Sequence, residues 1–179
     1  DKLTGPISGR PKSATFRTSD VVGLDTMRHV SKTTYEKVLN DEERDMFKIP
    51  DILDQLVDSG RLGQKTKAGF YKKNEDKTIF SLDLKTGEYS PQEKVRFDCF
   101  RIAKGHQKLP DKLKALCYGD DRGSKYFWEI TARTLIYSAN RIPEISDDIV
   151  NIDNGMKWGF GWEMGPFESW DAIGVQKSE

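Results

Sequence analysis

Apolar residues recur at helical spacing along most of this chain. In one stretch Ile52, Leu53, Leu56 and Val57 follow steps of one, three and four, which places them on one face of a helix. The broadest apolar face extends over residues 126–142. The same spacing predicts further helices at 16–24, at 26–39 with Asp25 as N-cap, at two short stretches within 95–118, and at 147–156.

One part of the chain departs from this pattern. Residues 61–71 carry too many glycines and charges for a helix, whereas residues 78–84 and 88–90 alternate as strands do. The turn at 85–87 joins these two strands into a tight hairpin. A lone hairpin is marginally stable in water, so we expect it to lie against the helices. The prediction is a mainly α protein with one small β-hairpin.

Composition and charge exclude several classes of function. The chain has 179 residues, and its 29 Lys and Arg are balanced by 29 Asp and Glu, so nothing global favours nucleic acid or a membrane surface. It has no apolar run long enough to span a membrane, and no signal peptide opens it. The two cysteines, Cys99 and Cys117, fit no metal-ligand spacing, so we expect no metal site.

The chain contains a faint internal repeat. Four residues near the start recur 151 positions later: Phe16, Asp20, Val22 and Gly23 correspond to Phe167, Asp171, Ile173 and Gly174. Asp153 corresponds to Asp1 with one residue of slippage. The long helix that carries Asn140 precedes the second copy, and its equivalent in the first copy would fall at about position −12. We therefore expect the chain to begin inside a repeat whose first helix lies upstream.

Three long motifs together resemble a known family. They are GRPKSATFRTSDVVGLD at residues 9–25, preceded by Gly5-Pro6, then LGQKTKAGFY at 62–71, which contains a K-T-x-x-G-F-Y pattern, and WGFGWEMGPFE at 158–168. In this order they resemble the helical carboxy-terminal region of 3-hydroxyacyl-CoA dehydrogenases of the long, often multifunctional, fatty-acid β-oxidation type. The resemblance covers nearly the whole chain.

The resemblance implies a fold and a reaction. The fold would be two tandem helical repeats packed as a pseudo-dimer: a first repeat at 1–95 with the motif loop and hairpin, connecting helices at 96–118, and a second repeat at 119–179. The reaction would be the NAD-dependent oxidation of (S)-3-hydroxyacyl-CoA to 3-oxoacyl-CoA in the cytoplasm of a bacterium or archaeon. The partners would be an upstream Rossmann domain, the acyl-CoA substrate and an enoyl-CoA hydratase domain in some members.

The chain lacks the parts that perform this chemistry in the family. No G-x-G-x-x-G follows a strand, so a phosphate cradle for the dinucleotide is absent. His29 and His106 do not lie in the context of the family's catalytic histidine. Asn140 is the repeat counterpart of the family's catalytic asparagine and is read as a capping or packing residue. We therefore expect no catalytic residue here and no activity without the upstream domain.

The motif loop holds the one candidate contact to the cofactor. By resemblance, Lys65 reaches bound NAD from the helical side, where a cation meets a ribose hydroxyl or a phosphate oxygen. The alternative is a solvated lysine beside other loop lysines. The remaining motif residues are expected to be structural: Gly63, Thr66, Gly69, Phe70 and Tyr71.

Two further interpretations stay open. Arg10, Lys12 and Arg17 form either contacts to the phosphates of coenzyme A or a solvated cluster beside a helix. The chain as a whole is either the substrate-side and assembly region of the dehydrogenase or a stand-alone helical interaction or acyl-CoA-binding module.

Overall fold

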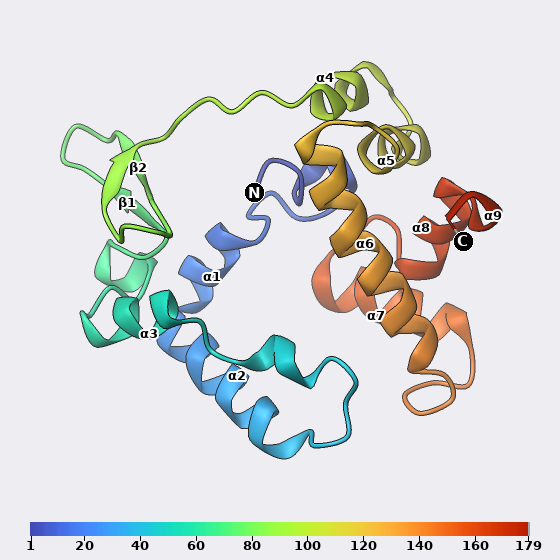
Figure 1. Ribbon diagram of the computed structural model, residues 1–179, viewed down its shortest axis with the longest axis horizontal. Helices are drawn as coiled ribbons and strands as arrows, with labels where there is room; N and C mark the ends of the chain where they lie inside the picture. The colour runs from blue at the N-terminus through green and yellow to red at the C-terminus, as the bar shows by residue number, and fades with distance from the viewer. Residues whose placement is uncertain (179) are drawn as a thin grey trace. The chain divides into compact units, whose positions relative to one another are not determined.

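A computed structural model describes residues 1–178 of the chain (Figure 1). It is mainly α-helical with one small antiparallel sheet, as the sequence predicts. The chain forms two compact units, which we describe separately. The larger unit combines Asp1–Ala14 with Val95–Glu179, and the smaller unit is Thr15–Lys94. No helix among the described residues is long and apolar enough to cross a membrane.

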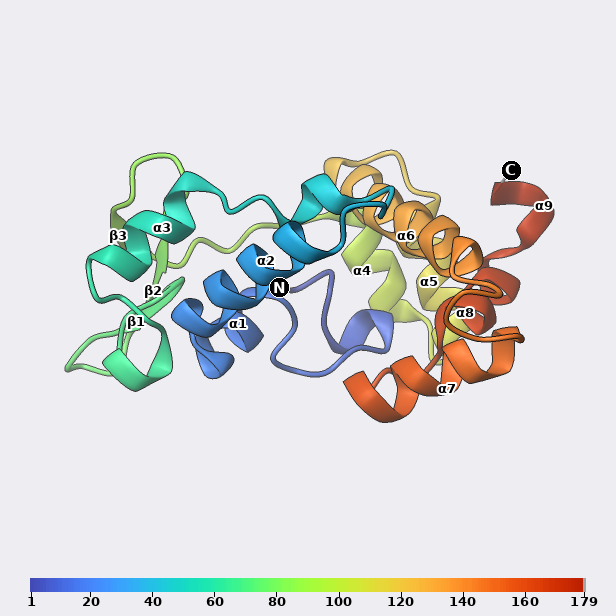
Figure 2. The same cartoon turned by 90° about the horizontal axis from the view of Figure 1, so that it is seen from below.

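The smaller unit packs helices against the sheet. Its elements are α1 (Phe16–Val22), α2 (Leu24–Lys37), the 3₁₀ turn η2 (Arg44–Phe47), α3 (Asp51–Asp58), the 3₁₀ turn η3 (Gln64–Thr66), β1 (Tyr71–Lys73), β2 (Ile79–Leu82) and β3 (Tyr89–Pro91). Figures 1 and 2 both show α3 beside the sheet. Leu53 and Leu56 of α3 are buried in one cluster with Leu24, Phe70 and Leu82. The predicted apolar face of α3 is therefore its packing face.

The predicted hairpin is confirmed and is part of a larger sheet. The strand order is β1-β2-β3 and both pairs are antiparallel, with Ser81 opposite Tyr71 on one side and Ser90 on the other. The turn closes where Asp83 Oδ1 accepts the backbone N–H groups of Lys85 and Thr86. Sequence patterning misses β1 because three residues are too few to show alternation.

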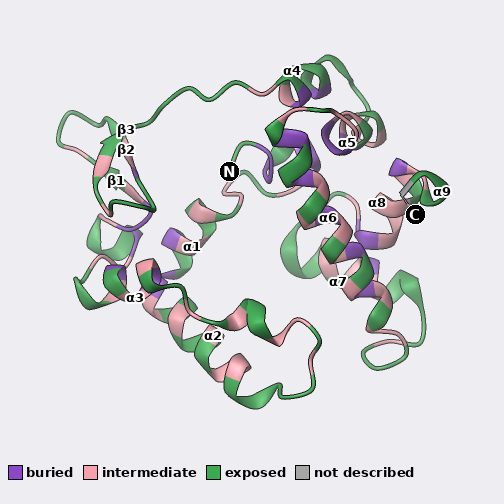
Figure 3. Ribbon diagram, viewed as in Figure 1, coloured by how far each residue is buried: buried purple, intermediate pink, exposed green. Residues whose placement is uncertain are grey.

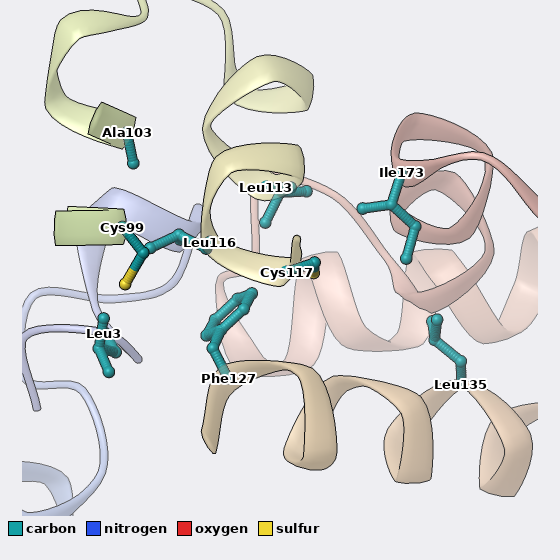
Figure 4. Packing of buried hydrophobic residues seen from close by; sticks show 9 residues of the cluster. All are labelled: Leu3, Cys99, Ala103, Leu113, Leu116, Cys117, Phe127, Leu135 and Ile173. Carbon is teal, nitrogen blue, oxygen red and sulfur yellow. The ribbon is translucent and has the colours of Figure 1, made fainter. Parts of the chain in front are cut away.

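The larger unit is helical throughout. Its elements are the 3₁₀ turn η1 (Pro6–Ser8), α4 (Asp98–Gly105), α5 (Leu109–Cys117), α6 (Arg122–Asn140), α7 (Ile149–Phe160), α8 (Pro166–Ile173) and α9 (Val175–Ser178). Helix α5 contacts α4, α6 and α8. Figure 4 shows the resulting core, in which Cys117 of α5 lies over Phe127 of α6, Leu116 lies beside Cys99 of α4, and Leu135 of α6 lies below Ile173 of α8. Burial of this apolar surface is the main stabilising contribution to the unit.

Three helix starts differ from the prediction. Helix α7 begins at Ile149 rather than at 147, because the Asp148 side chain accepts the Asn151 N–H, and it ends at Phe160 rather than at 156. Helix α2 begins at Leu24 behind Gly23, so the expectation that Asp25 caps it is wrong; Asp25 lies in its first turn. Helix α6 begins four residues earlier than expected, at Arg122, because the Asp121 carboxylate accepts the N–H of Ser124 and also that of Cys99. One carboxylate thus caps α6 and fixes the start of α4 beside it.

Backbone conformation supports the internal repeat. Gly9 ends η1 with φ 70° and ψ 25°, and Gly161, 152 residues later, ends α7 with φ 65° and ψ 31°. Gly23 lies between α1 and α2 with φ 105° and ψ 128°, and Gly174 lies between α8 and α9 with φ 95° and ψ 110°. These conformations are strained for residues with a Cβ, so both copies require glycine at the same two places.

Candidate functional site

The K-T-x-x-G-F-Y loop is held in place by one buried carboxylate. Asp20 on α1 is 1% exposed, and its two carboxylate oxygens accept the backbone N–H groups of Phe70 at 2.8 Å and Tyr71 at 2.9 Å. The ring of Phe70 also packs edge-on against Phe16 of α1, with centroids 4.8 Å apart. Helix α1 therefore fixes the end of the loop and the start of β1.

The glycines of the loop leave room for this carboxylate. A Cβ on Gly69 would lie 2.1 Å from Asp20 Oδ1, and a Cβ on Gly63 would lie 2.3 Å from the Asp20 backbone oxygen. Both distances are far inside van der Waals contact, so neither position accepts a larger residue without movement of α1. Gly63 also has φ 98°, which disfavours any residue with a Cβ.

Thr66 closes the loop on itself. Its hydroxyl accepts the Leu62 N–H at 2.8 Å and donates to the Ala68 carbonyl at 3.1 Å. The backbone N–H of Leu24, the first residue of α2, donates to the Leu62 carbonyl at 3.1 Å. The short turn η3 that carries Lys65 is thereby attached to the beginning of α2.

Lys65 forms an ion pair at the surface of the smaller unit. Its ammonium donates to both carboxylate oxygens of Asp25, at 2.6 and 2.7 Å, and its side chain passes over the backbone of Gly23. The side chains are 47% and 39% exposed for Lys65 and Asp25, respectively. The ammonium has three N–H donors and the carboxylate has more than two acceptor positions, so both groups can also bind a ligand from the solvent side.

The two aspartates of the site have opposite pKa shifts. The hydrogen bond from Lys65 lowers the pKa of Asp25, so this carboxylate stays charged well into acid. Burial raises the pKa of Asp20, and the N–H donors of Phe70 and Tyr71 offset part of that effect. Burial and the nearby Asp20 charge raise the pKa of Tyr71. Asp20 therefore serves as a hydrogen-bonding anchor, and Asp25 is the available charge.

The other residues that the sequence singles out do not join this site. Asn140 is exposed and is the last residue of α6 in the larger unit. His29 and His106 are also exposed. Arg10 and Lys12 belong to the larger unit and Arg17 to the smaller one, so the structure does not assemble them as one cluster within a unit. Among residues 1–178, no group of three or more His, Cys, Asp or Glu side chains could hold a metal ion.

Sequence reasoning missed the two residues that organise the site. Asp20 was recognised as a repeated position and Asp25 as a helix cap, and neither was connected with the loop 40 or more residues away. The signal in the sequence is that Gly63 and Gly69 lie six residues apart in the loop, while Asp20 lies near the end of a short helix. Contacts of that length are decided by tertiary packing, which local patterns do not report.

Comparison with known proteins covers this site directly. Residues 6–73, which include Asp20, Asp25 and the whole motif loop, match the family model described as 3-hydroxyacyl-CoA dehydrogenase, C-terminal domain. A Bacillus subtilis (strain 168) protein named a probable 3-hydroxyacyl-CoA dehydrogenase is 51% identical over 178 residues, which is 99% of this chain and 22% of that protein. Residues 6–73 thus match the C-terminal domain of the 3-hydroxyacyl-CoA dehydrogenase family, and nearly the whole chain is similar to one segment of a relative with that name.

Other relatives are more distant. A Rickettsia felis protein named for a fatty acid oxidation complex trifunctional enzyme is 27% identical over 172 residues, 94% of this chain and 22% of its own length. A Deinococcus radiodurans protein named a probable 3-hydroxyacyl-CoA dehydrogenase is 43% identical over 76 residues, 42% of this chain and 21% of its own length. The chain thus spans about a fifth of the length of these relatives. No solved structure matches it.

Proposed function

We propose that this chain is the substrate-side and assembly region of an NAD-dependent 3-hydroxyacyl-CoA dehydrogenase. The reaction of the whole protein would oxidise (S)-3-hydroxyacyl-CoA to 3-oxoacyl-CoA in fatty-acid β-oxidation. The observation that carries the proposal is identity to the Bacillus subtilis relative along 99% of the chain, motif loop included. The remaining domains of the polypeptide would supply the dinucleotide fold and, as in a trifunctional relative, further activities on the same substrate class.

The chemistry itself would reside outside this chain. Hydride transfer needs a positioned cofactor and a general base within hydrogen-bonding reach of the hydroxyl. The sequence contains no dinucleotide fingerprint, and its two histidines are exposed: His29 lies on α2 and His106 directly follows α4. We therefore propose that the chain alone is inactive and that its contribution is to bind and to position.

Lys65 and Asp25 are the residues that would meet the cofactor. The pair has no net charge, so its attraction for a phosphate is weakened, whereas a donor beside an acceptor suits a hydroxyl that both gives and takes a hydrogen bond. Between the two ligands considered from sequence, the ion pair therefore favours a ribose hydroxyl. The bound NAD would supply hydride acceptance, and Lys65 and Asp25 would orient its ribose.

The test is to exchange segments between this protein and its relative. The segment of the Bacillus subtilis protein that matches this chain is replaced by residues 1–178, and reduction of acetoacetyl-CoA by NADH is measured beside the unmodified relative. The proposal expects the hybrid to retain activity within about tenfold of the relative, since the exchanged segments are 51% identical over 178 residues. A folded hybrid with no turnover would contradict the proposal and favour a stand-alone helical module.

A further inference from the structure

An open groove on the larger unit gathers four lysines around an apolar floor. Its volume is about 480 Å³, and it is formed by the amino-terminal segment, η1, α4 and α5. The basic lining residues are Lys2, Lys12, Lys104 and Lys112, and the floor includes Ile7 and Phe100. All of them belong to the same compact unit.

The positive charge of the groove is largely uncompensated. Among the described residues, no carboxylate forms a salt bridge with Lys12, Lys104 or Lys112; Asp1 is the acidic residue that lines the groove. Like charges gathered in one concave surface repel one another, and a bound anion relieves that repulsion. The chain has no net charge overall, so this concentration of lysine is a local feature.

The floor of the groove indicates what the anion would carry. Phe100 is half-buried, and the Lys104 ammonium lies 4.8 Å from its ring centroid. An aromatic face beside cations suits a planar ring on the same ligand as the negative charges, because base–aromatic stacking adds to phosphate attraction. Inorganic phosphate would use the lysines and leave the floor unused. A volume of about 480 Å³ is within the range of small-molecule sites.

We propose that this groove binds a phosphorylated nucleoside, such as the head group of coenzyme A or a free nucleotide. The lysines would contact the phosphates and Phe100 would contact the base. The choice of coenzyme A as the ligand rests on the proposed function. Binding of a phosphorylated nucleoside as such rests only on the residues of the groove. The groove would then hold such a ligand by its charged head group.

Binding to the isolated chain tests the proposal without any enzymatic assay. Titration calorimetry with coenzyme A, 3′,5′-ADP, ATP, pantetheine and inorganic phosphate is compared for the wild type and for the variant Lys104→Glu/Lys112→Glu. The control variant Lys67→Glu/Lys125→Glu changes net charge equally at two exposed lysines outside the groove. Circular dichroism verifies that both variants fold.

The expected result separates the sources as well as the site. Coenzyme A and 3′,5′-ADP should bind, pantetheine should not, and the groove variant should weaken binding at least about tenfold while the control stays within about twofold. Preference for coenzyme A over ATP would assign the coenzyme as the source, and equal affinity would assign free nucleotides. Three results would overturn the proposal: binding of pantetheine alone, inorganic phosphate binding as tightly as 3′,5′-ADP, or equal weakening in both variants.

Discussion

At the scale of single residues, Asp20 decides where the motif loop lies. Its carboxylate is buried and accepts two backbone N–H groups of the loop instead of hydrogen bonds from water. Gly63 and Gly69 lack a Cβ, which allows the loop backbone to lie close to Asp20. The sequence identified the loop residues Gly63, Thr66, Gly69, Phe70 and Tyr71, but their shared partner was out of reach of local patterns. Lys65 was likewise selected by resemblance, whereas its Asp25 partner follows only from the packing of η3 against α2.

Removing the Asp20 carboxylate should destabilise the smaller unit. In Asp20→Ala the N–H groups of Phe70 and Tyr71 lose their acceptor, one of them in a buried position, so we expect unfolding free energy to fall by about 3 kcal/mol. Asp171, the repeat counterpart of Asp20, is exposed and provides the matched control, with Asp171→Ala expected within about 0.5 kcal/mol of wild type. Urea denaturation measures both, and equal losses would contradict the anchoring role.

The Asp25–Lys65 pair predicts a defined pH response. Because the pKa of Asp25 in the folded chain is below its ordinary value, the stability that the pair adds is fully present above pH 3.8 and is lost as pH falls through the folded pKa. NMR titration of the Asp25 carboxyl carbon should give a pKa below 3.8 in the wild type and in Lys67→Met. In Lys65→Met the pKa should return toward 3.8; an unchanged value would mean that the pair does not form in solution.

Lys65 should affect cofactor binding more than turnover. In the hybrid enzyme, Lys65→Met should raise KM for NADH about tenfold, the loss of one charge-assisted hydrogen bond, with kcat changed less than about twofold. Lys67→Met removes an exposed lysine two residues away and should leave both constants near those of the parent hybrid. A fall in kcat at unchanged KM would contradict a role limited to binding.

At the scale of elements, glycine and aspartate mark several helix boundaries, among them the starts of α6, α7 and α8. The apolar face of α3 and the hairpin of β2 and β3 were predictable because periodicity 3.6 and alternation are local signals. The start of α6 was not predictable, because a glycine such as Gly123 usually disfavours a helix. In the structure Gly123 makes room for Phe97 and for the Cys99 sulfur, each within 3.0 Å of where a Cβ would lie.

Helix α7 carries exposed apolar residues, and exposed residues are green in Figure 3. Trp158 is one of them and is 80% exposed.

Two glycines with positive φ should respond differently to alanine. Gly60 has φ 74° and nothing within 4 Å of an added Cβ, so Gly60→Ala should cost about 1 kcal/mol of unfolding free energy from backbone strain alone. Gly63 has φ 98°, and its Cβ would meet the Asp20 backbone at 2.3 Å, so Gly63→Ala should cost at least about 3 kcal/mol. Thermal and urea unfolding compare the two, and similar costs would refute the close packing of the loop on α1.

At the scale of the whole molecule, the first repeat is divided between two compact units. Residues 1–14, with the Gly9 turn, pack in the larger unit, whereas α1, α2 and the motif loop form the smaller one. The sequence predicted the repeat from four matched residues, and the paired glycine conformations support it. The packing of the two copies on each other as a pseudo-dimer stays a prediction.

We propose that these motifs belong to a dehydrogenase but do not perform its chemistry. The most direct test is the rate of NADH-dependent acetoacetyl-CoA reduction by the isolated chain, with the hybrid enzyme as positive control in the same buffer. We predict turnover by the hybrid. For the isolated chain we predict a rate equal to that without protein, because its sequence has neither a dinucleotide-binding fingerprint nor a positioned general base. Reproducible turnover by the purified chain alone, abolished by substitution of His29 or His106, would contradict the claim.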